Sequence, residues 1–113
     1  MSDLTPGVVV LVDFDPVRGR EQAGQRPALV VSSDRYLALV DTLLHVLPIT
    51  SVERGWANHV PLRGASGLSR PSYVMTEQLR TVTRNRILRV VGAAAPGTLQ
   101  EVRLWLRDFL DLG

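Results

Sequence analysis

The chain has 113 residues, a net charge of only +2 and no cysteine. This length predicts a single domain over residues 1–113, and the lack of cysteine excludes disulfides, thiol nucleophiles and thiolate metal ligands. No apolar run reaches the roughly 18 residues of a membrane span. The first residues also lack the basic flank and apolar core of a secretory signal. We therefore expect a cytoplasmic protein without membrane segments.

All 13 basic residues are arginines. The guanidinium group pairs with phosphate through two parallel N–H donors and stacks on bases, so an arginine-rich surface suits nucleic acid. A genome-wide codon bias that replaces lysine with arginine would give the same composition. Composition alone leaves both explanations open.

Short apolar stretches recur along the chain, separated by polar segments that carry glycine or proline. The first, residues 7–14, is apolar on both faces over most of its length, which is typical of a buried strand. A short helical turn is expected at 34–39. Further strands are expected at 28–33, 43–50, 56–62, 71–75, 78–82 and 88–93. Many short strands at close spacing indicate an antiparallel sheet curled into a small barrel.

Two prolines and one apolar stripe refine this prediction. Pro48 should end or bulge the strand at 43–50, or lie at a free edge, because proline donates no ladder hydrogen bond. Pro96 fits the first turn of a helix over 96–110. Its core-facing stripe is expected to contain Leu99, Val102, Trp105, Leu106, Phe109 and Leu110. Leu104 lies outside this stripe, where a partner surface is one option.

A long polar stretch separates the first two predicted strands. Loops of this length are uncommon in small domains and are more often functional than idle. The stretch carries Glu21, Gln25 and Arg26, and Arg26 lies at the junction with the next strand, where a side chain is held firmly. A solvated hairpin loop with Arg26 in a surface ion pair is an equally weighted alternative.

Four sequence blocks resemble the signature of the MazF/PemK toxin family. Residues 12–16 read VDFDP, and residues 19–32 read GxEQxGxRPAxVxS. PITS at 48–51, TEQLRTV at 76–82 and Gly92 before the C-terminal helix continue the match in order. The resemblance implies a mainly β fold, an SH3-like barrel of the CcdB/PemK type with a C-terminal α-helix. It also implies a homodimeric, metal-independent endoribonuclease toxin without a cofactor. Its substrate would be single-stranded RNA, and a cognate antitoxin with an acidic, disordered segment would neutralise it.

Metal-free cleavage of RNA uses the ribose 2′-hydroxyl as the nucleophile. It needs a base, cationic donors to the phosphorane oxygens, and an acid for the departing 5′-oxygen. Arg26 can supply charge and paired donors, and Thr50 a hydroxyl at a strand end. By resemblance, Arg26 and Thr50 act at the scissile phosphate, and Glu21 matches a loop acid implicated in activity. The products would be a 2′,3′-cyclic phosphate and a 5′-hydroxyl.

Several further residues are candidates for RNA binding. Gln25 stands where some family members carry histidine, Gln78 matches a glutamine near the substrate groove, and Ser51 follows Thr50 in its block. His59 is a weaker candidate, whereas His45 is expected to be a hydrogen-bonded core or interface histidine. A basic face for RNA or an acidic segment, or simply a solvated surface, would contain Arg80, Arg84, Arg86 and Arg89. Trp56 and Tyr73 are possible stacking platforms.

Two rival functions share the predicted fold. One is a non-enzymatic gyrase poison of the CcdB type, because a fold does not fix a function. The other is an RNA-binding module without catalysis. Asp13 and Asp15 are paired carboxylates, but acids at that point more simply end a strand and turn the chain. We therefore expect no metal ion.

Overall fold

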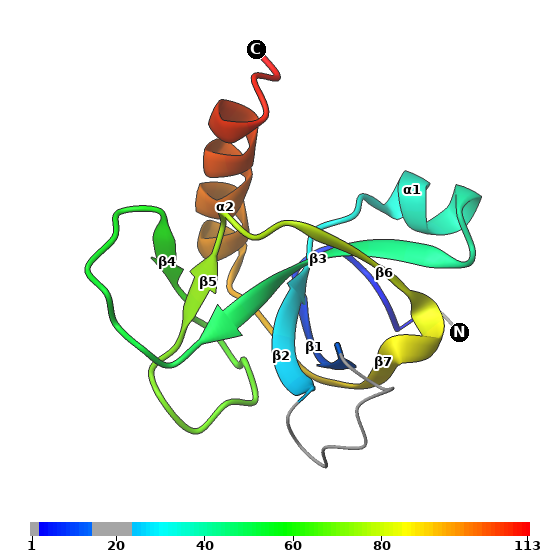
Figure 1. Cartoon of the computed structure of the whole chain (residues 1–113), viewed down its shortest axis with the longest axis horizontal. Coiled ribbons are helices and arrows are strands. Elements are labelled where there is room, and N and C mark those ends of the chain that lie inside the picture. Colours follow the sequence, from blue (N-terminus) through cyan, green and yellow to red (C-terminus); the bar gives the residue numbers. More distant parts are fainter. Residues whose placement is uncertain (1–2, 15–23) are drawn as a thin grey trace.

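The computed structural model describes residues 3–14 and 24–113. A strongly curled antiparallel sheet forms most of the molecule, and a long C-terminal helix packs on one side (Figure 1). In chain order the elements are β1 (Val8–Asp13), β2 (Gln25–Val30), α1 (Asp34–Leu39), β3 (Leu43–Thr50), β4 (His59–Pro61), β5 (Tyr73–Met75), β6 (Arg80–Thr83), the 3-10 turn η1 (Arg84–Arg86), β7 (Ile87–Ala93) and α2 (Pro96–Phe109).

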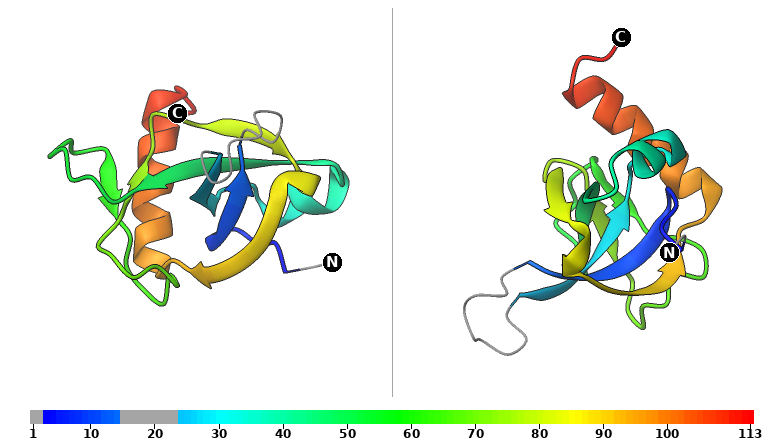
Figure 2. Two further views of the ribbon diagram at one scale, coloured as in Figure 1. Left: turned by 60° about the horizontal axis from the view of Figure 1, so that its bottom comes forward. Right: turned by 90° about the vertical axis from the view of Figure 1, so that its right-hand side faces the viewer.

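The strands follow the order β4-β5-β3-β2-β1-β7, and β6 pairs with β3 as well. Every pairing is antiparallel, so the predicted antiparallel sheet with a C-terminal helix is confirmed. The β1–β7 ladder shifts register at two points, between Val9 and Val10 and between Leu11 and Val12. Such irregularities increase local twist and bend a strand, which helps the sheet to curl (Figure 2).

Strand β1 is buried on both faces, as its sequence predicts. Val9, Val10 and Val12 are completely buried. Val10 and Val12 belong to a core cluster that includes Leu37 of α1. Val9 belongs to a second cluster that includes Val102 of α2. The sheet therefore separates two small cores, with one helix covering each.

Pro48 does not end its strand, contrary to one of the options predicted from sequence. β3 continues to Thr50, and Pro48 pairs with Ala28 of β2. On the opposite side, β6 pairs with β3 only up to Val46, and β5 pairs with it only from Ile49. Within the described chain, Pro48 therefore lies at a gap where one edge of β3 changes partners. This local free edge tolerates a residue without an N–H and lets β3 carry Thr50 beyond it.

Helix α2 ends one residue earlier than predicted, and its last turn does not pack on the core. Its first turns pack through Leu99, Val102, Trp105 and Leu106. Phe109 and Leu110 are 46% and 49% exposed, so their predicted core role is wrong. The reason is visible in Figure 2, where the C-terminal end of α2 extends beyond the sheet. Together with exposed Leu104 and Leu112, this leaves an apolar surface at the helix end.

The predicted strands at 56–62 and 71–75 shrink to the three-residue strands β4 and β5. The residues before each strand instead form loops, which Figure 1 shows beside the C-terminal end of β3. No described helix is long and apolar enough to cross a membrane.

Candidate active site

A groove of about 770 Å³ opens where β2 and β6 begin and β3 ends. Residues from the 51–58 and 62–72 loops form much of the rest of its wall, together with Phe14, Met75, Glu77 and Gln78. The groove brings together six of the residues predicted from sequence: Gln25, Arg26, Thr50, Ser51, Gln78 and Arg80. Glu21 lies outside the described residues.

Arg26 lies within the β1–β2 ladder rather than in the loop before it. β2 begins three residues earlier than predicted, because Asp13 pairs with Gln25 and Val12 pairs with Arg26. This pairing fixes the Arg26 backbone while the side chain stays exposed in the groove. Within the described residues, the guanidinium makes no hydrogen bond or ion pair. It can therefore meet an anionic ligand with its donors available.

Thr50 is the last residue of β3, and its backbone pairs with Tyr73 of β5. The Thr50 Oγ1 atom accepts a hydrogen bond from the backbone N–H of Val52 at 3.1 Å. Because the oxygen acts as the acceptor, the hydroxyl hydrogen remains able to donate to a ligand. The arrangement thus orients a donor at the groove.

The groove is strongly basic. Arg26, Arg54, Arg70 and Arg80 line it, whereas Glu77 is the single carboxylate among its described lining residues. Four guanidinium groups around one concave surface favour a polyanion such as nucleic acid. Arg54 and Arg70 were not identified from sequence. Both come from loops. Their proximity in sequence to the blocks at 48–51 and 76–82 was the one feature that could have indicated a place in the site.

Backbone contacts fix the loop that carries Arg70. The Leu62 N–H donates to the carbonyl of Ser72 at 2.8 Å, which closes the loop at its base. At the far side, a Cβ atom on Gly67 would lie 2.0 Å from the carbonyl oxygen of Val91. Gly67 also has a φ of +82°, so glycine is required there for both reasons. This close approach to β7 holds the loop against the sheet.

Glu77 is held by polar neighbours at one wall of the groove. His59 Nε2 lies 3.1 Å from each of its carboxylate oxygens, and Asn58 Nδ2 donates to Oε1 at 2.8 Å. Gln78 Nε2 donates to Oε2 at 3.3 Å. Burial would raise the pKa of Glu77, but the hydrogen bond from His59, with those from its own backbone and Gln78, lowers that pKa below its ordinary value.

The aromatic candidates separate into two environments. His59 is buried behind Glu77 and does not line the groove. Trp56 packs against the His59 ring with the ring centroids 4.7 Å apart, yet it is 52% exposed and lines the groove. Tyr73 lies outside the lining, and burial together with Glu53 raises its pKa. Only Trp56 therefore presents a ring at the groove among these three.

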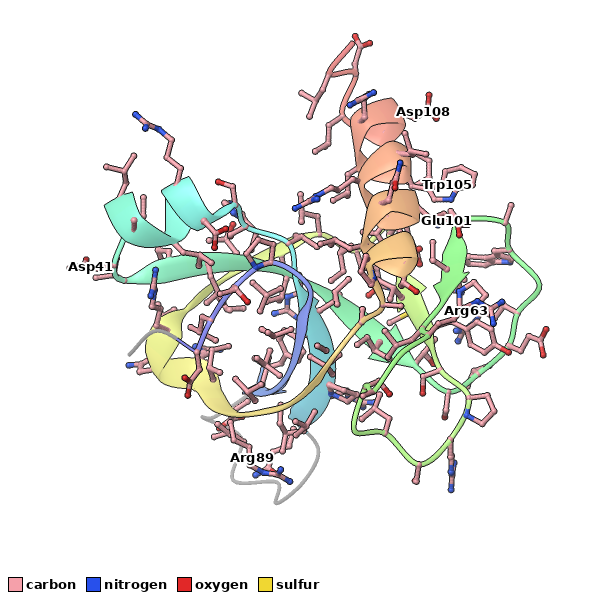
Figure 3. All side chains as sticks on the ribbon, turned by 180° about the vertical axis from the view of Figure 1, so that it is seen from behind. Asp41, Arg63, Arg89, Glu101, Trp105 and Asp108 are labelled. Carbon is pink, nitrogen blue, oxygen red and sulfur yellow. The ribbon has the colours of Figure 1, made fainter. Side chains whose placement is uncertain are left out.

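The structure divides the predicted arginine cluster, because Arg80 lines the groove whereas Arg84 and Arg89 line a separate pocket with Asp3 and Asp41. Arg84 Nη2 donates to two backbone carbonyls at the C-terminal end of α1, those of Leu37 and Val40. The distance from Nη2 to the Val40 oxygen is 2.9 Å. Arg86 Nη1 donates to the backbone carbonyl of Phe14, the residue that follows β1. Of the four arginines, only Arg80 is among the described residues that line the groove. Arg89 lies on β7, at the end of the molecule opposite Trp105 and the rest of α2 (Figure 3).

His45 agrees with its prediction as a hydrogen-bonded histidine. Its Nδ1 atom lies 3.0 Å from Ser32 Oγ, and its ring packs 4.5 Å from that of Tyr36. Within the described ranges, no group of three or more His, Asp or Glu side chains is placed to hold a metal ion.

Comparison with known proteins gives consistent matches over nearly the whole chain. A sequence profile of the PemK-like, MazF-like toxins of type II toxin–antitoxin systems matches residues 5–110. The endoribonuclease MazF9 of Mycobacterium tuberculosis is 35% identical over 112 residues, 94% of this chain and 95% of that relative. The endoribonuclease toxin MazF of Escherichia coli K12 is 36% identical over 98 residues, 86% of this chain and 85% of that relative.

A solved structure shares the fold as well. A chain in the crystal structure of MazE–MazF from Deinococcus radiodurans superimposes with a TM-score of 0.80. The two chains are 31% identical, and the match covers 97% of each.

Proposed function

The chain belongs to the PemK-like, MazF-like family of type II toxins, and we propose that it is an endoribonuclease that cleaves single-stranded RNA at specific sequences without a metal ion. The ribose 2′-hydroxyl attacks the adjacent phosphorus, and the 5′-oxygen leaves. The products are a 2′,3′-cyclic phosphate and a 5′-hydroxyl. One observation carries this proposal: Arg26 and Thr50, from neighbouring strands, line the same arginine-rich groove.

Arg26 and Thr50 act on the scissile phosphate. Negative charge develops on the phosphorane oxygens in the transition state, and preorganised donors stabilise it. Arg26 supplies a charged pair of parallel donors, and Thr50 supplies a hydroxyl oriented by its bond to Val52. Glu21 is proposed for acid–base catalysis on the family resemblance. In the proposed step a base takes the proton of the attacking 2′-hydroxyl, and an acid gives a proton to the departing 5′-oxygen.

The rest of the groove binds the RNA on either side of the scissile bond. Arg54, Arg70 and Arg80 provide charge for neighbouring phosphates, and half-exposed Trp56 provides a face for base stacking. Side chains that can hydrogen-bond bases or sugars are Gln25, Ser51 and Gln78. Sequence preference then depends on the shape of these walls.

We infer two protein partners. A cognate antitoxin neutralises the enzyme by placing an acidic, initially disordered segment in the basic groove, because that segment and RNA present the same charge. A second copy of the chain covers the apolar end of α2, where Leu104, Phe109, Leu110 and Leu112 are exposed. The RNA substrate favours a cytoplasmic location.

The test is incubation of the purified protein with a long RNA in EDTA, with the cut sites mapped by primer extension. Cleavage at a short recurring sequence is expected, with 5′ ends that cannot be ligated until they are phosphorylated. Strict Mg²⁺ dependence or 5′-phosphate products would refute the 2′-hydroxyl mechanism. Intact RNA together with inhibition of DNA gyrase would favour the non-enzymatic poison of the same fold.

A further inference from the structure

Two arginines that are close in sequence hold the same phenylalanine. Arg86 Nη1 donates to the backbone carbonyl of Phe14 at 3.2 Å. The Arg80 guanidinium carbon lies 4.4 Å from the centroid of the Phe14 ring, within the range of a cation–π contact. Both arginines come from the β6–η1 segment, whereas Phe14 directly follows β1. The contacts therefore join parts of the chain that are far apart in sequence.

Phe14 directly follows the last rung of the β1–β2 ladder. Its N–H donates to the carbonyl of Gly24 at 2.7 Å. The next rungs pair Asp13 with Gln25 and Val12 with Arg26. Phe14 also lines the groove and packs against the core cluster of β1. A shift of Phe14 would therefore move the end of the hairpin that carries Arg26.

Arg86 is poorly placed to bind RNA itself. It is half-buried, and it is not among the residues that line the groove. The neighbouring Ile87 pairs with Val12, so Arg86 reaches the end of β1 from the turn that precedes the adjacent strand β7. Its Nη1 atom is already used by the Phe14 carbonyl. Arg80 differs, because it lines the groove and can contact both Phe14 and a ligand.

We propose that Arg86 is a positioning residue for RNA cleavage. By holding the Phe14 carbonyl, it fixes the last rungs of the β1–β2 ladder and keeps Gln25 and Arg26 aimed into the groove. This inference rests on the proposed endoribonuclease function. It replaces the sequence-based prediction that Arg86 binds RNA directly. The two roles can be told apart because they give different kinetics. A phosphate contact governs affinity and its salt dependence, whereas a positioning contact governs the rate of the bound complex.

The experiment compares Arg86→Ala, Arg86→Lys and the control Arg35→Ala, since Arg35 is exposed on α1 and outside the groove. Single-turnover cleavage at saturating RNA should fall about 10- to 100-fold in Arg86→Ala, the scale of a small misplacement of a catalytic group. The slope of log affinity against log salt should stay that of the wild type. Arg86→Lys keeps one charged donor and should recover most of the rate. Arg35→Ala should match the wild type.

Hydrogen exchange of the free protein gives a second readout that needs no RNA. The Phe14 amide should exchange faster in Arg86→Ala than in the wild type, while amides in α2 keep their protection. If Arg86→Ala fails to fold by circular dichroism, Arg86→Gln, a neutral donor, takes its place in the same assays.

Two outcomes would overturn the inference, and a third would refute the proposed function instead. A salt slope smaller by about 0.7, with the saturated rate unchanged, would assign Arg86 to a phosphate contact and overturn it. Unchanged exchange at Phe14 together with a wild-type rate would also overturn it. A wild-type protein that cleaves no RNA would instead refute the proposed function, whereas wild-type cleavage with an unaffected variant refutes this inference alone.

Discussion

The hydroxyl oxygen of Thr50 accepts a hydrogen bond from the backbone N–H of Val52, which restricts the directions in which the hydroxyl can donate. We expect Thr50→Val to remove this donor without a large change in shape. The loss of one preorganised donor to a developing oxyanion typically lowers a rate by about 10²–10³. Single-turnover cleavage at saturating RNA should fall on that scale. Thr50→Ser keeps the hydroxyl and should retain most of the activity.

RNA affinity provides the control for this pair of variants. Both should bind a non-cleavable RNA, with a 2′-deoxy sugar at the scissile position, nearly as well as the wild type. Equal loss of activity in Thr50→Val and Thr50→Ser would assign the effect to packing at the end of β3 instead of to the hydroxyl.

The contact between His59 and Glu77 predicts a pH dependence of stability. The pKa of Glu77 is lower in the folded protein than its ordinary value of 4.5, so its ionised form stabilises the fold. This stabilisation is fully present above about pH 4.5 and is lost as the pH falls through the folded pKa. The Tm of Glu77→Gln should therefore lie below that of the wild type at pH 6, and the gap should narrow as the pH falls below about 4.5 and through the folded pKa. A gap that is constant over this range would show that the carboxylate charge does not stabilise the fold.

Arg70 and Arg84 form a matched pair of arginines with different predicted roles. Arg70 lines the groove, whereas the Arg84 guanidinium donates to the carbonyls of Leu37 and Val40. Arg70→Ala should reduce the salt slope of single-stranded RNA binding by about 0.7, the value for one phosphate contact, and leave the Tm unchanged. Arg84→Ala should lower stability by about 1.5–3 kcal/mol, because charged hydrogen bonds are lost, with an unchanged slope.

Salt titrations of RNA affinity and thermal melts of both variants make this comparison. The sequence is compatible with either an RNA contact or a solvated surface for Arg84, so a reduced slope in Arg84→Ala with a wild-type Tm would assign Arg84 to RNA binding.

Local patterns predicted the strands well where burial decides them. The valines of β1 are apolar on both faces in the sequence and are buried between two cores in the structure. Pro48 and Phe109 were harder to predict, because each depends on where a neighbouring element ends. β6 and β5 leave a gap beside Pro48, and the sheet stops before the last turn of α2.

The site residues also divide into those that sequence patterns predicted and those that depend on distant parts of the fold. Arg26, Thr50 and Gln78 belong to sequence blocks shared with the family, and the structure gathers them in one groove. The role of Arg70 could not be predicted from the sequence, because its position depends on the close approach of Gly67 to the Val91 carbonyl. The partners of Arg84 and Arg86 are backbone carbonyls more than 40 residues away, which side-chain type cannot indicate.

Substitution of Arg26 tests the proposed chemistry most directly. Lysine keeps the positive charge but lacks the planar fork that pairs with two phosphorane oxygens at once. Arg26→Lys should therefore cleave at least about 100-fold more slowly than the wild type, and Arg26→Ala more slowly still. Both variants should remain folded, because the Arg26 side chain is exposed and makes no hydrogen bond within the described residues. Single-turnover cleavage at one mapped RNA site measures the rate, and circular dichroism reports the fold. A folded Arg26→Ala protein with near-wild-type cleavage would remove Arg26 from the mechanism.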